Sequence, residues 1–343
     1  LAEARAAQTR ARSGQRLSPL DGVPISWKDL FDTAGRATEA GSALLRGRIP
    51  ERDAKVLRNA SAMGLVCIGK THMSELAFSG LGLNPMTESP PCVNDPSAVS
   101  GGSSSGAAAS VAFGLAAAAI GSDTGGSVRI PAAWNDLVGL KTTAGSLPLD
   151  GVVPLCESFD TIGPLSKTVE DAALLFAALH GRPALDMQTC NLRGKRLAVL
   201  RTAAFDDLRD APRIGFETAL ERLAEAGAII ENVEIPAVSD ALPLSPILYT
   251  SEAYGTWKDV IEAQPDLMFD EILKRFRGGA EFTAADYVAA WHKLGALRQS
   301  YTEKTAGYDA VLCPTAPILP PDAQRLLSDE TYYVTENLLA LRN

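Results

Sequence analysis

Residues 100–129, SGGSSSGAAASVAFGLAAAAIGSDTGGSVR, place two glycine–serine clusters on either side of a run of small apolar residues. Glycine–serine runs that stand alone in polar sequence are typical of flexible linkers. Here residues 107–113 and 115–120, between the clusters, are apolar and uncharged, so they are predicted to be buried. A flexible linker does not alternate with core. The stretch is therefore predicted to hold two serine-bearing turns against one core element, with hydroxyls and bare backbone N–H groups side by side.

The overall composition is ordinary for a globular protein and gives no sign of polyanion binding. The chain has 343 residues, 46% of them hydrophobic and 21% charged, and its formal net charge is −9. This charge argues against nucleic acid or an anionic membrane as the main partner. The best apolar run, residues 111–120, is too short to span a bilayer and is interrupted by Gly114. The length is compatible with about two domains or with one large α/β domain.

The cysteines and histidines indicate neither a disulfide framework nor a metal site. Five cysteines are scattered through the chain without a CxxC pair: Cys67, Cys92, Cys156, Cys190 and Cys313. An odd, sparse set of this kind is typical of reduced thiols in a cytoplasmic protein. Zinc-type spacing is absent, and the chain has only three histidines. We therefore expect a cytoplasmic protein without a metal site.

Strand and helix patterns alternate along the chain. Strands are predicted at residues 23–26, 65–68, 196–200, 229–233 and 310–313. Helices are predicted at residues 1–16, 52–63, 168–180, 212–226, 251–263 and 284–305, and another is predicted to begin at 73–78. Thr168 is the expected N-cap of its helix, and Gly181 follows the last helical residue. This alternation predicts an α/β fold with a mixed sheet.

One motif match is better explained by ordinary structure. Residues 64–71, GLVCIGKT, fit the phosphate-binding pattern G-x-x-x-x-G-K-[ST]. Such a loop needs a strand before its first glycine and open backbone amides between the two glycines. Here a predicted helix precedes Gly64, and the residues between the glycines have the pattern of a buried strand. A helix end followed by a core strand is the favoured interpretation.

A second match offers a histidine-dependent hydrolase chemistry. Residues 102–106, GSSSG, fit the nucleophile elbow G-x-S-x-G with Ser104 as the nucleophile. The elbow follows a strand, whereas residues 92–100 are rich in proline, asparagine and serine. Its histidine would have to be His180 or His292, and both stand in predicted helices. The α/β-hydrolase mechanism is kept as the second chemical hypothesis.

Two further features point to serine chemistry without histidine. Lys28 follows a predicted strand among apolar residues. A lysine at a strand end is usually a surface residue, but a desolvated lysine loses its charge more easily and can then act as a base. Gly125 and Gly126 directly precede Ser127, so backbone N–H groups there can approach a substrate carbonyl closely, as an oxyanion hole requires. A glycine turn capped by a serine explains that spacing equally well.

Taken together, these residues resemble the amidase signature family of serine hydrolases. The similar segments are GVPISWKDLFDTAG (22–35), SGGSSSGAAASVAFG (100–114), GSDTGGSVRIPAAW (121–134), VGLKTTAG (138–145), FDTIGPLSKTVEDAA (159–173) and YDAVLCPTAPILPP (308–321). They cover most of the chain. The resemblance implies an α/β/α sandwich around a large mixed β-sheet, formed by residues 1–343 as a single domain. It also implies that the native N-terminus and the family's C-terminal elements are missing.

The resemblance also assigns roles to individual residues. It makes Ser127 the nucleophile, Ser103 the bridging serine after a cis Gly102–Ser103 bond, and Lys28 the base. Neutral Lys28 would accept a proton from Ser103, which in turn accepts one from Ser127, and Ser127 attacks an amide carbonyl. The products implied are a carboxylic acid and ammonia or an amine, with no metal or organic cofactor. The oxyanion donors expected are the backbone N–H groups of Thr124, Gly125 and Gly126, with that of Ser127 as a further candidate.

Departures from the family pattern lie outside the three catalytic positions. The positions that differ from common family residues are Ser105, Ala107, 135–136 and 142–144. Ile130 stands where the A subunits of tRNA-dependent amidotransferases usually have glutamine. This residue and the altered run 141–146 favour a stand-alone amidase.

Two alternatives to that interpretation stay open. A glutaminase-type A subunit of a tRNA-dependent amidotransferase would need a partner protein and an ammonia tunnel. A catalytically inactive family member would serve as a binding protein, although the intact set of Lys28, Ser103 and Ser127 argues against it. For partners, we expect a small-molecule amide substrate, no nucleic acid and no membrane, and we leave a homodimer open.

Overall fold

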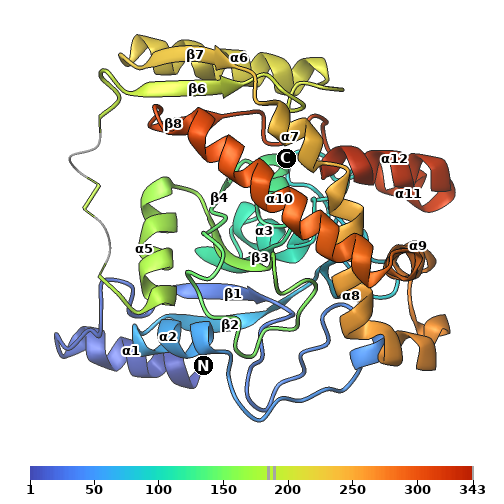
Figure 1. Cartoon of the computed structure of the whole chain (residues 1–343). Coiled ribbons are helices and arrows are strands. Elements are labelled where there is room, and N and C mark those ends of the chain that lie inside the picture. Colours follow the sequence, from blue (N-terminus) through green and yellow to red (C-terminus); the bar gives the residue numbers. More distant parts are fainter. Residues whose placement is uncertain (184–185, 188–190, 342–343) are drawn as a thin grey trace. The chain divides into compact units, whose positions relative to one another are not determined.

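The computed structural model describes residues 1–183, 186–187 and 191–341, so Cys190 lies outside the described residues (Figure 1). The chain divides into two compact units. The first comprises residues 1–186, 263–272 and 320–337, and the second comprises residues 187–262, 273–319 and 338–343. The Lys28 segment and both glycine–serine clusters belong to the first unit.

The first unit is built on a five-stranded mixed sheet in the order β2-β1-β3-β5-β4. Its strands are β1 (Pro24–Lys28), β2 (Val66–Thr71), β3 (Ala118–Asp123), β4 (Val138–Gly139) and β5 (Thr161–Ser166). β1 runs parallel to β2 and β3, whereas β5 runs antiparallel to β3 and β4. The predicted α/β fold with a mixed sheet is confirmed. Since parallel strands end at the same edge of a sheet, the ends of β1, β2 and β3 bring Lys28, Thr71 and Asp123 to one edge.

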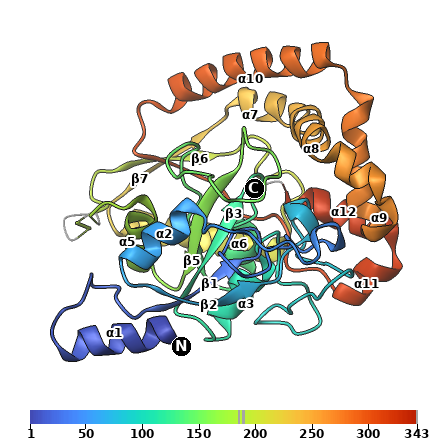
Figure 2. The ribbon, with the colours of Figure 1, turned by 90° about the horizontal axis from the view of Figure 1, so that it is seen from below.

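Helices pack on this sheet. The first unit contains α1 (Ala2–Arg12), α2 (Lys55–Ala62), α3 (Ser105–Ala112), α4 (Arg129–Trp134), α5 (Val169–His180), α11 (Ala323–Ser328) and most of α12 (Glu330–Ala340). α3 packs against β1, β2, β3 and β5, and α5 packs against α2, β4 and β5 (Figures 1 and 2). The ends of α5 are as predicted, because the Thr168 hydroxyl accepts the Asp171 N–H at 3.0 Å and Gly181 has a left-handed φ of 71°.

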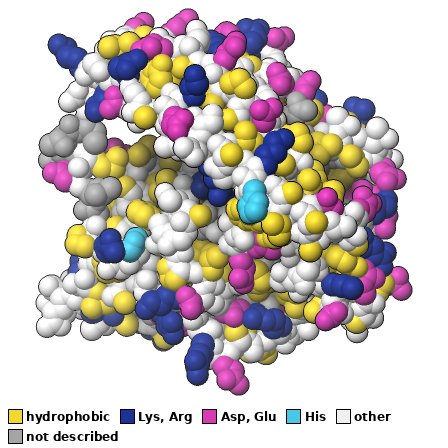
Figure 3. Space-filling model, in the orientation of Figure 1, with side chains coloured by type: hydrophobic (Ala, Val, Ile, Leu, Met, Phe, Trp, Pro, Cys, Tyr) yellow, Lys and Arg dark blue, Asp and Glu magenta, His cyan; other side chains and the backbone are white. Residues whose placement is uncertain are grey.

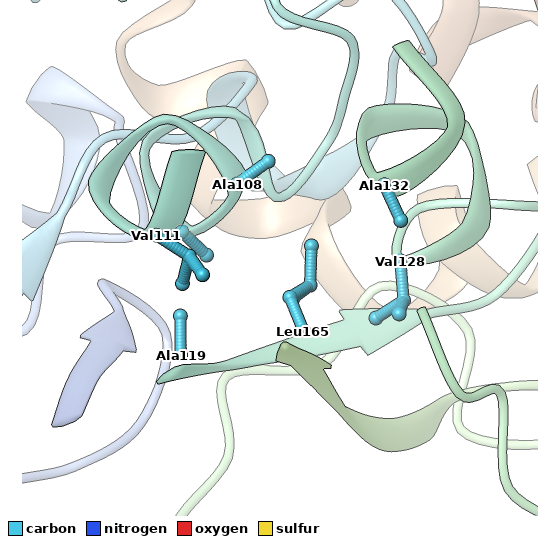
Figure 4. Packing of buried hydrophobic residues seen from close by; sticks show 7 residues of the cluster. Ala108, Val111, Ala119, Val128, Ala132 and Leu165 are labelled. Atoms are coloured by element: carbon cyan, nitrogen blue, oxygen red, sulfur yellow. The ribbon is translucent and has the colours of Figure 1, made fainter. Parts of the chain in front are cut away.

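The helix α3 approaches the sheet closely because its residues are small. The core cluster around it consists of Ala107, Ala108, Val111, Ala119, Val128, Ala132 and Leu165 (Figure 4). A Cβ on Gly106 would lie 2.6 Å from the His72 backbone nitrogen, so a side chain there would push α3 away. The predicted burial of the apolar run is confirmed for β3 and for α3 as far as Val111, but it is wrong for Ala117, which is exposed, and for Phe113 and Leu115, which are 47% and 72% exposed. All three stand in the turn between α3 and β3, which faces solvent.

Residues 64–71, which match the phosphate-loop pattern, lie mostly in a regular strand. β2 spans residues 66–71 and pairs in parallel with β1, so the residues between Gly64 and Gly69 form a strand for most of their length. The interpretation of this segment as a helix end followed by a strand is confirmed, but the expected burial of the strand is wrong beyond Val66, since Ile68 is 48% exposed.

The helix predicted to begin at residues 73–78 is wrong. Only a short 3-10 turn, Glu75–Ala77, forms there. Leu76 and Ala77 have φ values of +44° and +63°, which a right-handed helix does not contain. The Leu76 N–H donates instead to the Ala40 carbonyl at 2.9 Å. A contact between segments distant in sequence therefore overrides the local helical pattern.

The second unit is built on a three-stranded parallel sheet in the order β7-β6-β8. Its strands are β6 (Arg196–Leu200), β7 (Ile229–Val233) and β8 (Ala310–Leu312). Its helices include α6 (Asp210–Glu225), α7 (Pro236–Ala241), α8 (Leu244–Ala263) and α10 (Ala284–Thr305), while α9 (Asp270–Arg277) begins in the first unit. A capping box between Thr283 and Asp286 starts α10. The strands and helices predicted here are confirmed, with α8 beginning earlier than expected.

The outer surface carries charges of both signs. On the face drawn in Figure 3, lysine and arginine side chains are interspersed with aspartate and glutamate. Within the described ranges, no helix combines the length and the apolar character needed to cross a membrane. The charge on this face is therefore mixed rather than concentrated in one patch.

Candidate active site

Lys28 is the last residue of β1 and is buried at the edge where the parallel strands end. Ser26, two residues earlier, bonds through its hydroxyl to that of Ser110 on α3 at 2.8 Å. Because side chains two residues apart in a strand share a face, Lys28 points toward the same side of the sheet as α3. Its Nζ donates to Ser103 Oγ at 2.6 Å and to Ser122 Oγ at 2.7 Å. The predicted contact between Lys28 and Ser103 is present, whereas Ser122 was missed by the sequence analysis.

Burial makes Lys28 a much weaker base for protons than an exposed lysine. It lowers the pKa of Lys28 from 10.5 to about 7, and the negative charges of Asp160 and Asp123 only partly oppose this change. At neutral pH a large fraction of molecules therefore carries the neutral amine. A neutral amine in contact with a hydroxyl can accept its proton.

Ser103 lies in a turn that is held by backbone contacts. The Gly102–Ser103 peptide bond is cis, as the sequence resemblance implied. The Gly102 N–H donates to the Gly80 carbonyl at 2.8 Å, and the Ser103 carbonyl accepts the Ser74 N–H at 3.2 Å. A Cβ on Gly102 would lie 2.5 Å from the Gly82 nitrogen, which explains why glycine stands before the serine. Ser103 is fully buried.

Ser104 has a structural position in the same turn. Its N–H donates to the Ser127 carbonyl at 3.1 Å, and its hydroxyl donates to the Ser122 carbonyl at 3.2 Å. It is fully buried and directly precedes α3, but irregular chain rather than a strand leads into it. This setting lacks the strand that a nucleophile elbow requires. Ser104 instead joins the first glycine–serine turn to the second.

The turn between β3 and α4 carries Ser127 and is organised by Asp123. The Asp123 carboxylate accepts the N–H groups of Gly126 at 2.8 Å and Val128 at 3.1 Å. It also accepts two bonds from the Arg129 guanidinium, at 3.0 and 2.9 Å. Burial alone would raise the pKa of Asp123. The hydrogen bonds and positive charge of Arg129, together with the hydrogen bonds from the two N–H groups, hold this pKa below its usual range. Asp123 therefore stays ionised and fixes the turn on both sides of Ser127.

The three expected oxyanion donors lie in this turn, but they differ in their partners. The Gly126 N–H already donates to Asp123, and Gly126 has a φ of +116°, which favours glycine. The Thr124 hydroxyl donates to Asp160. An oxyanion role for the Gly126 N–H therefore requires it to be shared between Asp123 and a substrate. Gly125 stands between them in the same turn.

Ser127 itself is 4% exposed. Among the residues that the structure describes, no hydrogen bond joins the hydroxyls of Ser103 and Ser127. Their two segments are joined instead through the Ser104 N–H and the Ser127 carbonyl. Lys28 and Ser103 are thus brought into contact, and Ser127 is placed in the neighbouring turn.

Asp160 supplies a second buried carboxyl group near Lys28. It accepts the N–H groups of Leu155 at 2.9 Å and Cys156 at 3.1 Å, besides the Thr124 hydroxyl. Burial raises its pKa, and the hydrogen bonds and the charge of Lys28 oppose this only in part. Asp160 stands in the segment 159–173 that resembles the family, but its role beside Lys28 becomes evident only in the folded chain.

A small cavity adjoins these polar groups. Its volume is about 10 Å³, which is room for roughly one water-sized group. It is lined by Ser122, Thr124 and Asp160 on its polar side, and by Leu30, Ala77 and Leu155 among its apolar residues. In the described part of the chain, no cluster of three or more His, Cys, Asp or Glu side chains could hold a metal ion. The polar groups gathered here are hydroxyls, the Lys28 amine, backbone N–H groups and the carboxyl groups of Asp123 and Asp160.

Comparisons with known proteins identify the family to which the chain is similar. A family model described as Amidase matches residues 1–342. The 2-amino-5-chloromuconic acid deaminase of Comamonas testosteroni is 35% identical, over 99% of this chain and 75% of that protein. The A subunit of the glutamyl-tRNA(Gln) amidotransferase of Chloroflexus aggregans is 32% identical, over 98% and 76%. A solved structure described as that of an amidase has a TM-score of 0.86 at 30% identity, covering 99% of this chain and 79% of the other.

Proposed function

We propose that this chain, which belongs to the Amidase family, cleaves a linear carboxylic amide through Lys28, Ser103 and Ser127. Members of this family are hydrolases that act on C–N bonds. The observation that carries the proposal is the contact of 2.6 Å between the buried Lys28 amine and the Ser103 hydroxyl. The pKa of Lys28, lowered to about 7, supports a role as base at neutral pH.

The reaction proceeds by proton transfer through the two serines. Lys28 Nζ accepts the hydroxyl proton of Ser103, which accepts that of Ser127. Ser127 Oγ then forms a bond to the amide carbon, and the carbonyl oxygen becomes an oxyanion. Backbone N–H groups of Thr124, Gly125 and Gly126 stabilise that oxyanion. This transfer requires the hydroxyls of Ser103 and Ser127 to come within hydrogen-bond distance.

Breakdown of this intermediate completes the cycle. The proton held by Lys28 returns through the serines to the leaving nitrogen as the C–N bond breaks, which releases ammonia or an amine. An acyl ester remains on Ser127. Water, deprotonated through the same groups, attacks the ester and releases the carboxylic acid. Each proton taken by Lys28 is returned, so the site is regenerated without a metal or organic cofactor.

Active-site labelling tests the assignment of the nucleophile. A fluorophosphonate reacts with an activated serine, and mass spectrometry of the digest locates the adduct. We expect it on Ser127 and expect none in Ser127→Ala. An adduct on Ser104 would support the elbow mechanism instead. A panel of linear amides, assayed for ammonia or amine release, then tests the reaction class, and an enzyme inactive on every member would favour a binding role.

A second candidate function rests on the similarity to amidotransferase A subunits, which is 32% identity over 98% of this chain. Such a protein would release ammonia from glutamine for its partner proteins. The difference at Ile130 favours the stand-alone amidase. Glutamine hydrolysis that appears only after partner proteins are added would support the second candidate, whereas turnover of simple amides by the isolated chain would support the first.

We also propose a cytoplasmic setting and one catalytic domain over residues 1–343. The five cysteines are an odd, sparse set without a CxxC pair, which fits a reducing compartment. Cell fractionation tests the compartment, and limited proteolysis tests whether the two compact units separate. Sedimentation velocity distinguishes a monomer from a homodimer.

A further inference from the structure

Asn337 on α12 makes two buried hydrogen bonds to a segment far away in the sequence. Its Oδ1 accepts the Ser79 hydroxyl at 3.1 Å and the Gly80 N–H at 2.9 Å. Asn337 is 5% exposed and Ser79 is 2% exposed. The hydroxyl of Tyr333, one turn earlier in α12, donates to Ser79 Oγ at 3.3 Å. This end of α12 is therefore anchored to Ser79 and Gly80 by polar contacts that exclude water.

The anchored segment is in direct contact with the turn that carries Ser103. The Gly80 carbonyl accepts the Gly102 N–H at 2.8 Å. A Cβ on Gly82 would lie 2.4 Å from the Gly101 carbonyl oxygen, so the two backbones touch without intervening side chains. A displacement of Gly80 is therefore passed directly to Gly102, the residue before Ser103.

We propose that Asn337 is a positioning residue that holds the Ser103 hydroxyl against Lys28 by fixing Gly80 and, through it, Gly102. The inference rests on the proposed function, since it assigns Ser103 a part in proton transfer. An amide oxygen has two lone pairs and so satisfies both donors at once. An apolar side chain of similar size would leave the Gly80 N–H and the Ser79 hydroxyl buried without an acceptor.

Loss of the acceptor alters the geometry of the site as well as its stability. The Gly80 N–H must turn toward water or another acceptor. This turn rotates the peptide bond before Gly80 and so shifts the Gly80 carbonyl, which accepts the Gly102 N–H. The Lys28–Ser103 contact of 2.6 Å leaves little tolerance for such a shift. A displacement of about 1 Å in a reacting group can lower a rate by roughly 100-fold.

The test compares Asn337→Leu, Asn337→Asp and Asn59→Leu in the full chain. Asp keeps an acceptor oxygen in place. Asn59 is the matched control, because its amide donates to the Leu179 carbonyl at 2.8 Å, in the same unit but away from the catalytic turn. For each variant, the rate constant for fluorophosphonate labelling of Ser127 is measured beside the melting temperature. If Asn337→Leu does not fold, Asn337→Ser replaces it, since serine is too short to reach Gly80.

We expect Asn337→Leu to slow labelling by at least about tenfold, and Asn337→Asp to recover most of that rate. Asn59→Leu should lower the melting temperature while its labelling rate stays that of the wild type. Equal labelling of the wild type and folded Asn337→Leu would overturn the positioning role alone. Equal slowing in Asn59→Leu and Asn337→Leu would also overturn it, because general destabilisation would then explain both. Absence of Ser127 labelling in the wild type would overturn the proposed function and this inference with it.

Discussion

The guanidinium of Arg129 and the carboxylate of Asp123 form a two-point ion pair, with Nε and Nη2 donating at 3.0 and 2.9 Å across the turn that carries Ser127. Asp123 is fully buried and Arg129 is partly exposed. The same carboxylate accepts the Gly126 and Val128 N–H groups on either side of Ser127. This pair therefore determines the shape of the second glycine–serine turn.

Asp123→Asn should disturb that turn while preserving the size of the side chain. Removing one partner of a buried ion pair leaves the other charge uncompensated, which costs about 3–5 kcal/mol of the free energy of unfolding. We expect a loss near the lower end, because Arg129 reaches solvent, together with much slower labelling of Ser127. Urea denaturation and labelling kinetics measure both effects. Glu231→Gln, which breaks the exposed pair with Arg196, is the control and should change neither much.

The rate of acylation should depend on pH through Lys28. Because its pKa is lowered to about 7, the neutral amine forms as pH rises through that value. The rate should therefore increase about tenfold per pH unit below pH 7 and level off above it. Initial rates of labelling from pH 5 to 9 test this. A profile that is flat over this range would show that Lys28 is not the base.

The same pKa has a consequence for stability, with a definite sign. A lysine whose pKa is lowered by folding binds fewer protons in the native state than in the unfolded state between about pH 7 and 10.5. Stability therefore rises with pH across that window, and below it the burial of the ammonium is fully unfavourable. We expect Lys28→Met to be inactive but more stable than the wild type at neutral pH. Denaturation at several pH values should show this difference shrinking as pH rises, and a less stable Lys28→Met would contradict the prediction.

Ser122 should influence the lysine that it contacts at 2.7 Å. Its hydroxyl accepts a hydrogen bond from Nζ and so favours the charged amine and fixes its orientation. We expect Ser122→Ala to lower the maximal labelling rate by about tenfold and to move the pH profile to lower pH. Ser122→Thr keeps the hydroxyl and should retain the wild-type profile. A profile in Ser122→Ala that matches the wild type would remove Ser122 from the network.

Gly102→Ala tests how tightly the first turn is packed. The added Cβ would lie 2.5 Å from the Gly82 nitrogen and 2.6 Å from Ser74 Oγ. Overpacking of this kind costs about 1–3 kcal/mol, and we expect labelling of Ser127 to be lost because Ser103 is displaced. Gly255→Ala is the control, since its Cβ would meet nothing within 4 Å in the middle of α8. That variant should be as active as the wild type and slightly more stable.

Elements whose signals are local could be predicted from neighbouring residues alone. Thr168 and Gly181 mark the ends of α5, and the β–α–β pattern of residues 196–233 is formed as predicted. Capping and periodicity act over one or two turns, so neighbouring residues suffice to specify them. The motif resemblance also placed Lys28 and Ser103 in one site, and their contact is present. The roles proposed for these residues and for Ser127 remain predictions.

The contacts that hold these residues, and the pKa of Lys28, depend on the folded chain and have no local sequence signal. Ser103 and Ser122 lie 75 and 94 residues from Lys28 in the sequence, and Asn337 lies 257 residues from Gly80. The lowered pKa of Lys28 comes from complete burial among these distant segments, which no local pattern encodes. Long-range packing likewise replaced the helix expected at residues 73–78 by a short turn. The candidate reactive groups could be named from local sequence motifs. Their geometry and charge could not, because burial and contact are properties of the whole fold.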